Sequence, residues 1–131
     1  MKARIISTIP ETVLSYNIGD KKEALEKAAA SLNMRHTEIP LDKAGESLGF
    51  LAGYNGFASN GTAVSAEGEC VIFSGISGKR LDMLLKAMRG TGLNIPLKAV
   101  VTAHNQSQSV VWLLEELAKE HEAVTKAKGG R

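Results

Sequence analysis

One side chain in this sequence has the type and position that acid-base chemistry requires. His104 lies in the polar turn Thr102-Ala103-His104-Asn105, directly after a predicted strand. Histidine is the side chain suited to proton transfer near neutral pH. Catalysis would also need a nucleophile or a carboxylate beside the imidazole, and the sequence places neither next to His104. We therefore expect no catalytic residue.

Two cations in the first turn of a predicted helix are a candidate anion site. Lys79 and Arg80 follow Gly75 and Ser77, and the free amides of a helix N-terminus bind anions. Phosphate-binding loops have a different spacing, with four residues between the glycines and Ser or Thr after the lysine. The alternative, which we favour, is that both cations are solvated and pair with acidic neighbours, because single charges on a surface contribute little.

The remaining histidines and the single cysteine do not form a metal-binding pattern. His36, His104, His121 and Cys70 lack the short spacings of zinc sites. No nucleophile elbow, Cys-x-x-Cys pair or dinucleotide-binding glycine motif occurs. Cys70 begins a predicted buried strand, where a cysteine behaves as a small hydrophobic residue. We expect no metal and no cofactor.

Strands and amphipathic helices alternate along the chain and must position these side chains. Strands are predicted at residues 12–18, 35–39, 70–73 and 97–101. Helices are predicted at residues 21–34, 43–51 and 78–90, and from Ser107 or Ser109 onward. Asp20, Asp42 and Ser77 are expected to cap the first three helices. Each helix carries apolar residues at the three- and four-residue spacing of a buried face.

This alternation predicts an α/β fold. We expect a small, open, mostly parallel sheet of four or five strands with helices on both faces, in the Rossmann- or flavodoxin-like order 2-1-3-4. The chain is expected to be one domain spanning residues 1–131. Residues 1–11 would form an N-terminal arm or an edge strand, and residues 125–131 a frayed tail.

In such a sheet, ligands bind beyond the carboxyl ends of the strands, where the strand order reverses. The predicted crevice therefore lies between the first and third strands and is assembled from three loops. Its residues would be Tyr16, Asn17, Gly19, Ser74, Gly75, Ser77, Thr102, His104 and Asn105. Lys79 and Arg80 would lie beside it, so that a small anionic ligand is one hypothesis.

Six glycines between Gly45 and Gly68 mark a long connection without periodicity. The pairs Asn55-Gly56 and Asn60-Gly61 favour turns, since both residue types tolerate positive φ. Within this glycine-rich loop, residues 53–68, the stretch without periodicity runs from Asn55 to Glu67. It would be either a mobile lid or, as we favour, a surface loop or extra hairpin. Gly45 and Gly49 would allow a short helix to approach its neighbour closely.

Trp112 lies on the polar side of the last predicted helix. The apolar stripe of this helix consists of Val110, Leu113, Leu114 and Leu117, and Trp112 projects away from it at about 100° per residue. An aromatic side chain at such a position is a candidate interface contact, which would imply an oligomer. Alternatively, it packs under the preceding loop or the N-terminal arm. Both explanations remain open.

The composition excludes several classes of function. Of 131 residues, 44% are hydrophobic and 23% charged, and the net charge is +2, which gives no electrostatic case for nucleic acid or membrane binding. No apolar run approaches the ~20 residues that span a bilayer. A single cysteine is compatible with a reducing cytoplasm, where we expect the protein to reside.

The run VIFSGISGKRLDMLLKAMRGTGLNIPLKAVVTAHNQSQSVVWLLEELAKEHEAV resembles the core of a small bacterial family known as domain-of-unknown-function family 3783. The upstream segment SLGFLAGYNGF is similar to a Leu-Gly-x-Leu-x-Gly segment of the same family, so the resemblance covers residues 12–124. Lys79 and Arg80 depart from the acidic residues common there in the family. The resemblance implies a related fold and no catalytic residues, since the family has no assigned activity.

Two hypotheses about function follow. The first, which we prefer, is a non-enzymatic domain that associates with itself or with another protein. The second is a protein that binds a small molecule, an anion or a nucleotide in the predicted crevice, and that could be an enzyme.

Overall fold

The computed structural model describes residues 10–129. Its strands are β1 (Thr12–Tyr16), β2 (Arg35–Ile39), β3 (Cys70–Ser74) and β4 (Lys98–Val100). Its helices are the short 3-10 helix η2 (Gly19–Lys21), α1 (Lys22–Ala30), α2 (Leu48–Ala52), α3 (Gly78–Gly90) and α4 (Val110–Gly129). Every predicted strand and helix is therefore present. Residues 1–9, most of the predicted arm, lie outside the described residues.

The four strands form one sheet in the order β2-β1-β3-β4, which confirms the predicted order. β1 pairs with β2, and β3 with β4, in parallel. The two central strands β1 and β3 are antiparallel, with Thr12 opposite Ser74 and Tyr16 opposite Cys70. The sheet is thus mixed. The expectation that all carboxyl ends meet at one edge is wrong.

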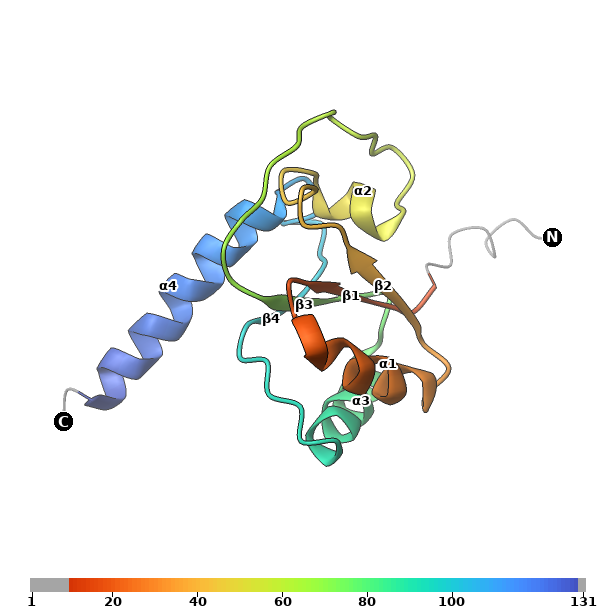
Figure 1. Ribbon diagram of the computed structural model, residues 1–131, viewed down its shortest axis with the longest axis vertical. Helices are drawn as coiled ribbons and strands as arrows, with labels where there is room; N and C mark the ends of the chain where they lie inside the picture. Colours follow the sequence, from red (N-terminus) through yellow and green to blue (C-terminus); the bar gives the residue numbers. More distant parts are fainter. Residues whose placement is uncertain (1–9, 130–131) are drawn as a thin grey trace.

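The direction of β3 is reversed because segment 55–68 carries the chain back along the sheet. After β2, the chain crosses one face through α2, and the Tyr54 hydroxyl reaches the Ser74 hydroxyl, 3.0 Å away, at the end of β3. The loop then returns, and the Ala66 amide donates to the Tyr16 hydroxyl over 2.9 Å at the opposite end of the sheet. β3 therefore begins beside the end of β1 (Figure 1).

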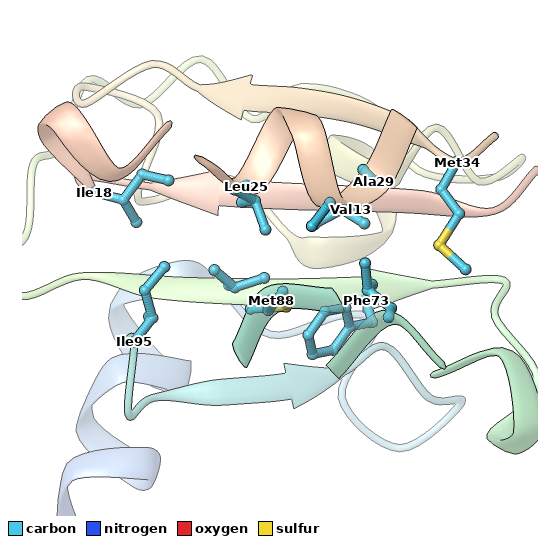
Figure 2. Packing of buried hydrophobic residues seen from close by; sticks show 11 residues of the cluster. Val13, Ile18, Leu25, Ala29, Met34, Phe73, Met88 and Ile95 are labelled. Carbon is cyan, nitrogen blue, oxygen red and sulfur yellow. The ribbon is translucent and has the colours of Figure 1, made fainter. Parts of the chain in front are cut away.

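Helices cover both faces of the sheet, as predicted, and each face has its own core. Val71 and Phe73 of β3 join the core beneath α1 and α3, whereas Cys70 and Ile72 join the core beneath α2 and α4. This alternation is the two-residue period of a strand buried on both faces. Figure 2 shows the first core, with Leu25 and Ala29 of α1 facing the strands.

The helix caps are partly as predicted. Ser77 caps α3 through its hydroxyl, which accepts from the Arg80 amide, and Ser109 likewise accepts from the Trp112 amide at the start of α4. Asp20 does not cap α1, because it lies within η2. The second helix is shorter than predicted and is capped by Ser47 in place of Asp42.

The last helix extends beyond the sheet. Its first turns pack on the second core through Val110, Leu113 and Leu114, and its later turns project away from the body of the molecule (Figure 1). The helix continues to Gly129, through most of the segment expected to fray. Residues 130–131 lie outside the described part.

Candidate functional site

The antiparallel pairing of β1 and β3 divides the predicted crevice into two groups of residues at opposite ends of the sheet. Tyr16, Asn17 and Gly19 lie at the end where β1 and β2 finish. The other group lies where β3 and β4 finish and consists of Ser74, Gly75, Ser77, Thr102, His104 and Asn105. A single crevice formed by all of them does not exist.

The first group holds the returning loop in place. Tyr16 is fully buried, and its hydroxyl donates to the Leu41 carbonyl over 2.8 Å and accepts from the Ala66 amide. The Asn17 side-chain amide donates to the Gly68 carbonyl over 2.9 Å. Their polar atoms therefore bind the protein's own backbone, which gives them a structural role.

In the second group, Thr102 and Asn105 are satisfied by local bonds, and the Ser74 hydroxyl bonds to the Tyr54 hydroxyl. The Asn105 side chain accepts from the Thr102 amide over 2.8 Å and donates to the Val100 carbonyl over 3.0 Å. The Thr102 hydroxyl accepts from the amides of His104 and Asn105 over 3.2 Å. The predicted Thr-x-x-Asn segment is thus a self-contained turn, and His104 is exposed on it.

Arg80 is engaged within the protein. Its guanidinium forms two hydrogen bonds with the Glu11 carboxylate, at 2.9 and 2.7 Å, and a third with the Leu32 carbonyl at 2.6 Å. These bonds lower the pKa of Glu11 and raise the pKa of Arg80 from their usual values. The alternative that we favoured, pairing with an acidic neighbour, is confirmed for Arg80. Lys79 is exposed beside it.

A Ser-His-Glu arrangement that sequence analysis missed links β1, β2 and α1. The Ser15 hydroxyl lies 2.9 Å from Nε2 of His36, and Nδ1 of His36 lies 3.5 Å from the Glu26 carboxylate. This order of groups resembles the triad of serine hydrolases. Ser15, however, is 0% exposed, and its neighbouring amides belong to the sheet ladder, so neither substrate access nor an oxyanion hole is available. We assign it a structural role.

Glu46 is a buried carboxylate that organises the glycine-rich segment. It is 0% exposed, and its oxygens accept from the Ser59 hydroxyl over 2.5 Å and from the Asn60 amide over 2.9 Å. These bonds lower the pKa of Glu46, aided by the charge of Lys43. We call this set of bonds the Glu46 clamp. It holds the loop against the segment that precedes α2.

Two glycines allow the close approach that the sequence predicts. A Cβ atom at Gly49 would lie 2.7 Å from the Phe57 ring, and one at Gly45 would lie 2.5 Å from the Thr62 hydroxyl. Both distances are shorter than real side-chain contacts. The loop therefore fits closely on α2 and on the turn before it.

Cys70 has no chemical role in this arrangement. It is fully buried in the second core, and burial raises the pKa of its thiol to about 12. A thiol reacts as its thiolate, so this side chain is inert near neutral pH. Its prediction as a small hydrophobic residue is confirmed.

Two further candidates among the described residues are surface depressions. One, of about 500 Å³, is formed by the start of α1 and is lined by Gly19, Asp20, Lys22, Glu23 and Glu26. The described residues contain no group of three or more His, Cys, Asp or Glu side chains placed to hold a metal ion. The other, of about 170 Å³, lies between α3 and the edge strand and is lined by Phe73, Leu81, Leu85, Lys98, Ala99 and Val100.

The apolar depression adjoins the open edge of the sheet. β4 is the last strand, and Val100 is 38% exposed on it. Trp112, the other candidate contact, is half-buried and packs against the second core. The edge of β4 is thus the more accessible of the two surfaces.

Residues 69–124 match the family model described as a domain of unknown function (DUF3783). The predicted resemblance is confirmed over this range, which contains β3, α3, β4 and most of α4. No curated protein and no solved structure matches the chain. Within the described residues, no helix is long and apolar enough to cross a membrane.

Proposed function

We propose that this protein is a non-enzymatic self-associating module that pairs with a second copy through the edge of β4. The observation that carries this proposal is that no strand among residues 10–129 pairs with the outer edge of β4, which lies beside an apolar depression. A free strand edge presents backbone donors and acceptors on which another strand can form. The apolar side chains next to it supply area that pairing would remove from water.

The outward-facing backbone groups of β4 belong to Lys98 and Val100. The Leu97 carbonyl accepts from the Val71 amide over 3.1 Å, and the Val101 amide donates to the Phe73 carbonyl over 2.9 Å. Residues alternate along a strand, so positions 97, 99 and 101 bond to β3 and positions 98 and 100 face outward. One outward acceptor, the Val100 carbonyl, also receives the Asn105 side chain.

The opposite edge of the sheet is less suited to pairing. β2 has the sequence RHTEI, and its Arg35, Thr37 and Glu38 are exposed. Charged side chains on an edge strand oppose association. The only charged residue of β4 is Lys98, and its ammonium is directed back to the Ile95 carbonyl over 2.6 Å.

The sequence of β4 favours a second copy of this chain as the partner at its edge. In an antiparallel pair with its two-fold axis at Ala99, Lys98 of each copy lies opposite Val100 of the other, and all outward groups are matched. Like charges directly opposite each other would destabilise a strand pair, and this register places none opposite each other. The net charge of +2 adds little repulsion between copies.

A proline at position 100 tests the proposal. Val100→Pro removes an outward amide and leaves the bonds to β3 intact, since proline is tolerated where the amide faces away from the sheet. Sedimentation over a range of concentrations should show that the wild type dimerises and that Val100→Pro does not. Glu38→Pro removes the equivalent outward amide on β2 and should dimerise like the wild type.

A wild type that stays monomeric at every concentration contradicts self-association. Equal dimerisation of all three proteins contradicts the choice of edge, and Trp112→Ala then tests the other candidate surface. The second hypothesis, a protein that binds a small molecule, has no geometric support, because the residues of the predicted crevice lie at opposite ends of the sheet. A cytoplasmic location is part of the proposal, supported by the free, buried Cys70.

A further inference from the structure

We propose that Asn55 is a site of spontaneous deamidation, and that Asn60, in the same Asn-Gly sequence five residues later, is protected by the hydrogen bonds around it, which include the Glu46 clamp. The two asparagines belong to one loop and are both exposed. They differ in their hydrogen bonds. The inference does not depend on the proposed function.

Deamidation at an Asn-Gly pair is an intramolecular reaction that consumes water. The backbone nitrogen of the glycine attacks the Asn side-chain carbonyl carbon, and a C–N bond forms as ammonia leaves. Water then opens the resulting succinimide at either carbonyl, giving aspartate or isoaspartate. A following glycine favours the attack because it has no side chain to obstruct the ring and its backbone is free to rotate.

Asn55 and Gly56 have the freedom that ring closure requires. Neither the Asn55 side chain nor the Gly56 amide makes a hydrogen bond to another described residue. Gly56 has a φ of +90°, and a Cβ built on it would meet nothing within 4 Å. The side chain can therefore rotate toward the amide that attacks it.

Both polar atoms of the Asn60 side chain and its backbone amide are hydrogen-bonded. Its side-chain amide donates to the Gly45 carbonyl over 2.9 Å, and its side-chain oxygen accepts from the amide and hydroxyl of Thr62 over 3.0 and 2.8 Å. Its backbone amide donates to Glu46. The attacking nitrogen, that of Gly61, donates to the Ser59 hydroxyl over 3.2 Å. Ring closure at Asn60 would break the bond of its side-chain amide to Gly45 and the bond of the Gly61 amide to Ser59. The other bonds hold the side chain and backbone away from the geometry of attack.

Incubation of the folded protein at mildly alkaline pH, followed by mass spectrometry, tests the inference. Chymotryptic cleavage after Phe57 separates the two asparagines, and each conversion raises a peptide's mass by about one mass unit. We expect the Asn55 peptide to convert progressively and the Asn60 peptide to remain unchanged over the same period. No conversion at Asn55, or equal rates at both positions, would overturn the inference.

Two variants test whether the hydrogen bonds around Asn60 are what protects it from deamidation. Glu46→Gln removes the charge and one of the two acceptor oxygens of the clamp. Thr62→Val removes the hydroxyl bond to the Asn60 side chain. Both changes should accelerate conversion at Asn60 while leaving the Asn55 rate unchanged. Denatured wild type should convert at similar rates at both positions. An Asn60 rate that stays low in the denatured chain would assign its resistance to local sequence and contradict the role of the hydrogen bonds formed in the folded chain.

Discussion

At the scale of single residues, the buried carboxylate of Glu46 constrains the glycine-rich loop. A carboxylate removed from water is stable only when hydrogen-bond donors replace the lost solvent. The Ser59 hydroxyl and the Asn60 amide supply them from the loop. An aperiodic segment thereby acquires one conformation. The sequence predicts turns there but does not reveal which carboxylate they surround.

We expect Glu46→Gln to loosen segment 55–68 without unfolding the sheet, because the amide keeps the size of the carboxylate and loses its charge. Hydrogen exchange should become faster at the Asn60 amide and stay unchanged in β1. Since the pKa of Glu46 is lowered below its usual 4.5, the clamp contributes fully above about pH 4.5 and is lost as the pH falls through the folded-state pKa. Slow exchange of the Asn60 amide in Glu46→Gln would contradict this account.

At the scale of elements, local sequence patterns predict the helices and strands well, whereas the connecting segments do not predict how these elements are oriented. The apolar stripe of α3 is confirmed, with Leu84 and Met88 buried and Leu81 and Leu85 packed beside them. The direction of β3 could not be predicted, because it depends on the path of segment 55–68, which has no periodicity. Whether such a segment stays at one end of the sheet or returns along it depends on contacts with Tyr16 and Glu46, distant in sequence.

Gly49→Ala tests how closely this loop fits α2. The added methyl group would meet the Phe57 ring at 2.7 Å, and overpacking of this kind destabilises by roughly 1–3 kcal/mol. Chemical denaturation should show that loss. Gly78→Ala is the matched control, since its Cβ would lie in open space and the change should not destabilise. Equal stabilities of the two variants would contradict the close fit.

At the scale of the whole molecule, the candidate sites depend on which segments the topology brings together. The predicted crevice required β1 and β3 to be parallel, and their antiparallel pairing places its residues at opposite ends. The Ser15-His36-Glu26 arrangement was missed because its members come from three elements. The strand order was predictable and identifies β4 as an edge. The exposure of Val100 beside an apolar depression could not be predicted from the sequence and is known from the structure.

The most direct test of self-association is a disulfide formed across the proposed two-fold axis. In that register, Ala99 of one copy lies opposite Ala99 of the other as a pair without direct hydrogen bonds, with Cα atoms about 4.5 Å apart, within the range that a disulfide bridges. Cys70 is buried and should not compete. Mild oxidation of Ala99→Cys should therefore yield a covalent dimer, whereas Lys98→Cys should not. The absence of a dimer in Ala99→Cys, or equal dimer formation in both variants, would contradict the account.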